Sequence, residues 1–184
     1  KIASLQRRGR QMHLEFQDGD ALDADLVIGA DGARSFVRSA VGIEAQAWPY
    51  EQTAFVTHLR PEKSHGAIAR QRFLGDGPLG ILPLADGRVS VVWSTTPAQA
   101  EAALSADETA TGRMLSEASD YVLGSLEVAG PKGAFPLCAR HATAYVLPNL
   151  ALIGDAAHAI HPLAGQGANL GLQDAAELAA QISG

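Results

Sequence analysis

Apolar and polar positions alternate near the start of the chain and then give way to a continuous apolar run. The alternation covers residues 11–17, where one face carries Met12, Leu14 and Phe16, and it predicts a strand with one buried face. Residues 1–5 predict a preceding strand, joined to it by a turn rich in arginine. Residues 25–30 are almost wholly apolar, which is typical of a strand buried on both faces. A short helix is expected over residues 33–40.

The pattern changes after residue 45, where short strand-like segments are separated by glycine, proline and aspartate. These segments occupy residues 53–59, 67–73, 80–83 and 88–94. Their regular spacing predicts an antiparallel sheet. Two helices are expected next, over residues 97–105 and about 107–126, and then a strand over residues 135–145. The second helix would carry one apolar face, formed by Leu115, Ala118, Val122 and Ser125.

The last 35 residues combine a short apolar strand, a loop rich in glycine and a helix of small residues. The strand covers residues 150–153 and ends in Gly154 and Asp155. Gly165 and Gly167 allow a tight turn that exposes N–H groups where the helix begins. The helix is expected to bury one face, formed by Leu172, Ala175, Ala176, Ala179 and Ile182. A carboxylate at a strand end facing such N–H groups indicates a cofactor site; the alternative is that Asp155 only caps a turn.

Composition narrows the class of protein. The chain has 184 residues, of which 47% are apolar and 18% charged, as in an ordinary globular protein. A net charge of -6 argues against a nucleic-acid partner, which needs a basic surface. The single Cys138 excludes an internal disulfide and a cysteine-based metal site, and it fits a reducing cytoplasm. No apolar run is long enough to predict a transmembrane helix.

Two pairs of charged or titratable residues leave alternatives open. His158 and His161 have a metal-ligand spacing only on a regular helix, which Pro162 disfavours. We therefore expect no metal site and a local packing or hydrogen-bonding role for His158. Arg34 and Arg38 are one helical turn apart and could either steer a pyrophosphate or lie on a solvated helix face.

Two segments, taken together, resemble the paired signatures of a known family. In residues 25–38 an Asp-Gly pair precedes two arginines, and in residues 151–169 a Gly-Asp pair precedes Gly-Gln-Gly-x-Asn. This combination resembles the class A flavoprotein aromatic hydroxylases, the group that contains p-hydroxybenzoate hydroxylase. Residues 161–174 and 73–84 are most similar to its ubiquinone-biosynthesis branch. The pairing favours the cofactor interpretation of Asp155 over the simple turn.

The resemblance implies an α/β fold (α+β overall) in which one domain is inserted into another. Residues 1–45 and 136–184 would form part of an FAD-binding domain with a parallel sheet. Residues 46–135 would form a substrate-binding domain with an antiparallel sheet. The Gly-x-Gly-x-x-Gly fingerprint that holds the ADP half of FAD does not occur in these 184 residues.

Because this fingerprint is missing, we expect the chain to be an internal segment of a longer enzyme. By itself the segment is expected neither to retain FAD nor to catalyse the reaction. We also expect an unpaired strand edge beside residues 151–153. Such an edge favours self-association of the isolated chain.

The resemblance also assigns roles to individual residues. At the flavin, Asp155, next to Gly154, would bind the ribityl chain, and the backbone of Gly167 and Ala168 would meet the pyrimidine edge. Asn169 would support that turn. The carbonyl of Pro162 would face the substrate. Around the FAD pyrophosphate, the resemblance places Asp31, Gly32 and Arg38, a motif that the family also ties to NAD(P)H.

The activity implied by the resemblance is the hydroxylation of an electron-rich aromatic ring. NAD(P)H reduces FAD, and O₂ then supplies the hydroxyl group. The substrate would be a small aromatic compound, with a quinone precursor favoured. A lipid-tailed precursor would add peripheral contact with the inner membrane. The alternatives are a related flavoprotein (a halogenase, a reductase or a soluble-phenol hydroxylase) and a flavin-free fragment without catalysis.

Overall fold

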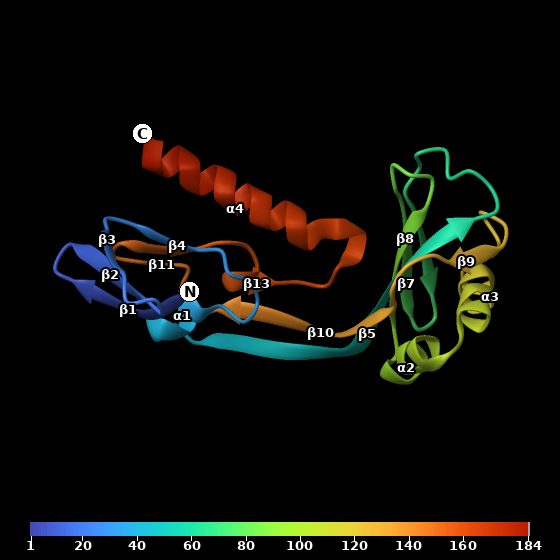
Figure 1. Cartoon of the computed structure of the whole chain (residues 1–184), viewed down its shortest axis with the longest axis horizontal. Coiled ribbons are helices and arrows are strands. Elements are labelled where there is room, and N and C mark those ends of the chain that lie inside the picture. Colours follow the sequence, from blue (N-terminus) through green and yellow to red (C-terminus); the bar gives the residue numbers. More distant parts are fainter. Residues whose placement is uncertain (184) are drawn as a thin grey trace. The chain divides into compact units, whose positions relative to one another are not determined.

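The computed structural model describes residues 1–183, which form two compact units. Unit 1 comprises Lys1–Trp48 and the chain from Cys138 onward, and unit 2 comprises Pro49–Leu137. Two long strands, β5 (Ala45–Pro61) and β10 (Gly133–Ala142), cross the two boundaries along the chain (Figure 1). Each unit has a hydrophobic core of its own.

Unit 1 begins with an antiparallel meander. Its strands are β1 (Ile2–Arg8), β2 (Gln11–Phe16) and β3 (Ala21–Ala24), in that spatial order. Met12 and Leu14 are buried on one face of β2, which confirms the alternation read from the sequence. They share a core with Val37 of the short helix α1 (Phe36–Ala40) and with Leu150.

A second small sheet in unit 1 contains the two strands that precede the predicted motifs. Its order is β11 (Val146–Leu147), β12 (Leu150–Leu152) and β4 (Val27–Gly29), with β12 parallel to β4. The unpaired edge predicted beside residues 151–153 is therefore wrong, because β12 has a partner on both sides. Burial of β4 on both faces is also wrong: Val27 packs into the core, whereas Ile28 points to the other face and is 45% exposed.

Unit 1 ends in a short strand and the longest helix. The strand β13 (His158–Ala159) pairs with β10, and α4 covers Gln166–Ser183. The buried face predicted for α4 is wrong, since Leu172 is 69% exposed and Ile182 is also exposed. The helix instead turns Gly171 toward Gly154: a Cβ atom on Gly171 would come within 3.2 Å of the Gly154 Cα. The half-buried side of the helix instead carries Gly171, Asp174 and Leu178.

Unit 2 is an antiparallel sheet with two helices packed on one face. The strands β5, β8 (Val89–Thr95), β7 (Gly77–Pro83) and β6 (Arg70–Leu74) are neighbours in that order. The helices α2 (Pro97–Ser105) and α3 (Glu108–Ala118) add Ala100 and Leu115 to a core centred on Phe55. The predicted antiparallel sheet is confirmed.

The helix α3 is shorter than the sequence pattern indicates. It stops at Ala118 because Asp120 and Tyr121 adopt positive φ angles of 58° and 51°, which no helix can continue. The chain then turns back to β9 (Leu126–Val128), which pairs with β5. Val122, expected on the apolar helix face, is exposed. Within residues 1–183, none of the helices has the length and apolar character needed to cross a bilayer.

Candidate functional site

The Asp-Gly motif forms the turn between β4 and α1. Gly32 has a φ of +82°, a conformation that favours glycine. The Asp31 carboxylate accepts a hydrogen bond from the Val37 N–H at 3.1 Å. Ser35 is the N-cap of α1, and its Oγ accepts from the Arg38 N–H at 2.9 Å. The polar residues of the motif therefore fix the local backbone, as N-cap residues commonly do.

These hydrogen bonds change the acidity of Asp31. Burial by itself would raise its pKa, but hydrogen bonds from the Ser35 hydroxyl and from the Val37 and Phe36 N–H groups outweigh it. The pKa of Asp31 therefore lies below its ordinary value. The side chain is held as a carboxylate at the beginning of α1.

We expect Asp31→Asn to lower stability near neutral pH and to lose this effect in acid. Because the folded pKa is lowered, the contribution of Asp31 is complete above the unfolded pKa of about 3.9 and disappears as pH falls through the folded value. Denaturant unfolding of both proteins across this pH range measures the difference. Asp20→Asn on the exposed hairpin is the control, and a difference that persists in acid would contradict the prediction.

Arg38 joins the two motifs physically. Its Nη1 donates to the Ala156 carbonyl at 2.8 Å, and its Nη2 donates to the Ala33 carbonyl at 2.9 Å. The residue is only 7% exposed, so a solvated helix face is the wrong interpretation for it. Burial, followed by the nearby Arg140, lowers the pKa of Arg38, and Asp31 opposes this. Arg140 also donates to the Ala33 carbonyl, so two cations meet at the Asp-Gly turn.

The Gly-Asp motif lies at the end of the neighbouring parallel strand. Leu152 of β12 pairs with Gly29 of β4, so both motifs follow the carboxyl ends of adjacent strands, where α/β sheets bind ligands. Gly154–Ala156 forms one 3₁₀ turn, in which Gly154 has a φ of +59°. Asp155 in this turn is exposed. Its carboxylate is therefore accessible to a ligand.

The turn after β13 leads directly into α4. Gly165, with a φ of +69°, ends a short 3₁₀ segment that follows Pro162. Gly167, Ala168 and Asn169 lie in the first turn of α4, where backbone N–H groups have no partner within the helix. A Cβ atom on Gly167 would meet no other atom within 4 Å. The predicted tight turn is present, and the cofactor roles of these residues remain predictions.

Asp174 is a residue of this site that the sequence analysis missed. Its Oδ2 accepts from the Gly154 N–H at 2.8 Å and contacts the Nε2 of His158 at 2.6 Å. His158 is buried, which confirms the local hydrogen-bonding role expected for it. The available signal was an acidic side chain one turn after Gly171 on a helix otherwise rich in alanine.

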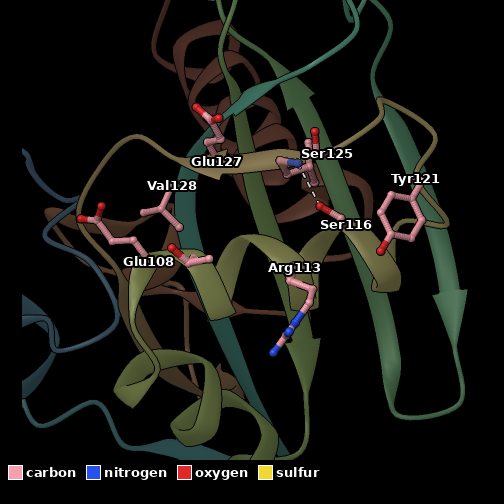
Figure 2. A pocket seen from close by; sticks show the side chains of 9 residues that line it. Glu108, Arg113, Ser116, Tyr121, Ser125, Glu127 and Val128 are labelled. Carbon is pink, nitrogen blue, oxygen red and sulfur yellow. Dashed lines mark hydrogen bonds between the residues drawn. The ribbon is translucent and has the colours of Figure 1, made fainter.

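A separate cavity of about 500 Å³ lies in unit 2 beside α3 and β9. Figure 2 shows charged side chains around it, including Glu108 and Arg113. The Ser116 hydroxyl there donates to the Gly112 carbonyl and accepts from the Leu126 N–H. This hydroxyl therefore supports the scaffold. The cavity contains none of the residues that the two motifs predict.

Comparisons with known proteins agree with this geometry. The sequence model of the "FAD binding domain" family matches residues 6–183. The chain is 42% identical over 175 residues to 3-demethoxyubiquinol 3-hydroxylase of Escherichia coli K12, covering 94% of this chain and 44% of that protein. It is 38% identical over 206 residues to human ubiquinone biosynthesis monooxygenase COQ6, mitochondrial, with the same two coverages. The chain thus spans less than half the length of these relatives.

A solved structure shows the same fold. It is PqsL, described as a probable FAD-dependent monooxygenase from Pseudomonas aeruginosa, with a TM-score of 0.81 and 25% identity. The match covers the whole of this chain and 53% of PqsL. Since the family match extends over nearly all residues and includes both motifs, the chain belongs to the FAD binding domain family.

Proposed function

We propose that this protein is an FAD-dependent monooxygenase that hydroxylates the aromatic ring of a ubiquinone precursor, with NAD(P)H as reductant. The observation that carries the proposal is the meeting of the two motifs. They follow adjacent parallel strands, and the hydrogen bond from Arg38 to the Ala156 carbonyl joins them. The E. coli relative is named for demethoxyubiquinol and the human relative for ubiquinone biosynthesis, and both names support the precursor class.

The residues present fit a flavin dinucleotide. The exposed carboxylate of Asp155 can accept hydrogen bonds from ribityl hydroxyls. The open space at Gly167 allows a flat ring to approach N–H groups at the start of α4, together with Ala168 and Asn169. Arg38 and Arg140 give the Asp-Gly turn a positive charge that suits a pyrophosphate.

In this arrangement the cofactor and the protein residues have different roles. FAD, when bound, supplies the redox and oxygen chemistry. The first turn of α4 favours partial negative charge at its N–H groups, so it would orient the electron-rich edge of the ring. Asp155 would fix the ribityl chain, and the Pro162 carbonyl would accept a hydrogen bond from the substrate. None of the residues named at this site has to transfer a proton in this scheme.

We propose the uncovered face of the unit 2 sheet as the surface for the aromatic substrate. The register pairs Phe73 with Pro78 and Gly80 with Val92, and paired residues share a face. This face is opposite the one that buries Leu79 and other core residues. Phe73 is 72% exposed. The glycine leaves room for a flat ring, and its other neighbour on this face is the polar Gln71.

The experiment that tests the function is purification of the full-length protein, followed by flavin absorbance and assays with ubiquinone-precursor phenols. We expect bound FAD, NAD(P)H oxidation that depends on the phenol, and a hydroxylated product. Asp155→Ala should lose most of the FAD, because the ribityl hydroxyls lose a charged acceptor worth about 1.5–3 kcal/mol per hydrogen bond. Glu177→Gln, on the exposed side of α4, is the control.

A colourless wild-type preparation that cannot be reconstituted with FAD would overturn the proposal. Equal turnover on a soluble phenol and poor turnover on every precursor would favour the alternative soluble-phenol hydroxylase. A chlorinated or brominated product would favour the halogenase.

Two finer proposals concern partners. A lipid-tailed precursor would bring the protein to a membrane surface, which co-sedimentation with vesicles measures. Self-association would involve the outer edge of β4, because β4 is the terminal strand of its sheet among the described residues. Light scattering measures the second, and a monomer at all concentrations would contradict it.

A further inference from the structure

We propose that Asp174 is a positioning residue, which holds the Gly154–Ala156 turn so that Asp155 is presented to the cofactor. The inference rests on the proposed function, in which Asp155 binds FAD. Asp174 itself touches neither cofactor nor substrate in this scheme. It acts through Gly154, the first residue of the turn that carries Asp155, and through His158, which follows the turn.

Asp174 acts as a single clamp on the backbone of Gly154 and on the side chain of His158. One oxygen, Oδ2, receives the Gly154 N–H at 2.8 Å and lies 2.6 Å from the Nε2 of His158. The Asp174 side chain is 26% exposed and that of His158 only 9%. Hydrogen bonds to a carboxylate in such a partly buried place are stronger than neutral ones.

Both ends of the clamp are held by regular structure. His158 belongs to β13, where it pairs with His141 of β10, and its ring lies 5.7 Å from the Tyr145 ring. Asp174 belongs to α4, whose Gly171 packs against Gly154. The carboxylate also contributes, after burial, to the raised pKa of Tyr145. The turn is therefore fixed between a sheet and a helix.

The turn needs such a clamp because it contributes little structure of its own. It has only three residues, and the Ala157 N–H to Gly154 carbonyl bond at 2.9 Å closes it. Gly154 adopts a φ of +59°, and glycine has more alternative conformations than any other residue. Without Asp174 the Gly154 N–H loses its acceptor, and the turn can move Asp155 away from its position.

The test compares Asp174→Ala, Asp174→Asn and the control Glu177→Gln in the full-length protein. Glu177 is an acidic residue on the same helix, and it is exposed. Two quantities are measured: the Kd for FAD by titration, and the exchange rate of the Gly154 amide by NMR. We expect Asp174→Ala to raise both by about tenfold or more. Asp174→Asn retains a neutral acceptor and should give a smaller change, and Glu177→Gln should give none.

A double-mutant cycle separates positioning from general destabilisation. If Asp174 acts through Asp155, then Asp174→Ala should change the Kd for FAD much less when Asp155→Ala is already present. Equal effects in both backgrounds would overturn the proposal, as would a Kd for FAD within twofold of wild type in Asp174→Ala. If Asp174→Ala does not fold, Asp174→Asn supplies the same comparisons.

The failure of the proposed function gives a different result. In that case the wild-type protein binds no FAD, and the Gly154 exchange rate alone decides whether Asp174 holds the turn. Exchange that is unchanged in both Asp174 variants would overturn the clamp itself.

Discussion

Gly112→Ala is expected to lower the free energy of unfolding of unit 2 by about 3 kcal/mol. Helix propensity alone predicts the opposite sign, because alanine stabilises a helix interior by up to about 1 kcal/mol relative to glycine. However, a Cβ atom on Gly112 would lie 2.3 Å from the Leu126 carbonyl oxygen. That oxygen belongs to the backbone of β9 and cannot move without separating α3 from the strand.

Denaturant unfolding, monitored by the fluorescence of Trp93 in the unit 2 core, measures the effect. Thr109→Ala, at an exposed position of the same helix, is the matched control and should be neutral or slightly stabilising. A stabilised Gly112→Ala protein would show that β9 does not pack against α3 as closely as described.

Arg38→Ala is expected to have the second large effect. It should lower the free energy of unfolding of unit 1 by about 2–4 kcal/mol. The substitution leaves the Ala156 carbonyl without the donor described above, and an unsatisfied buried polar group costs roughly 1–3 kcal/mol. It also removes an aliphatic stem that packs inside the unit. The Ala33 carbonyl keeps a donor in Arg140, which limits the loss there.

The matched control is Arg34→Ala, which lies in the turn before α1 and is exposed. Unfolding measurements should place this control within about 0.5 kcal/mol of wild type. On the proposed function, Arg38→Ala also weakens FAD binding, because the two motifs are no longer joined. Equal stability of the two arginine variants would contradict the structural role of Arg38.

The sequence predicted features that depend on local chemistry. The alternation of Met12 and Leu14 predicted which face of the strand is buried, and the motif glycines predicted turns. Both features depend on residues that are neighbours in the sequence. The end of α3 was missed because Asp120 and Tyr121 take positive φ without being glycine. The exposed face of Ile28 was missed because a strand's position in a sheet is set by other strands.

Within the site, the sequence showed the motifs but not the hydrogen bonds that connect them. Asp31 and Asp155 stand in recognisable patterns, but the bond from Arg38 to the Ala156 carbonyl joins residues far apart in the chain. The prediction of which side of α4 is buried was wrong for the same reason. The apolar spacing predicted a buried face with Leu172 and Ile182, whereas the half-buried positions include Asp174, Leu178 and Gly171, which lies against Gly154. A backbone contact of this kind leaves no trace in hydrophobic periodicity.

The parallel pairing of β4 with β12 has a consequence for the order of folding. Val27 pairs with Leu150, so the whole of unit 2 must be synthesised before this sheet can close. Unit 2 contains two hairpins, β6–β7 and β7–β8, whose strands are close in the chain and pair with little loss of loop-closure entropy. We therefore expect unit 2 to fold early on the ribosome and the corner with Asp31 and Asp155 to assemble last.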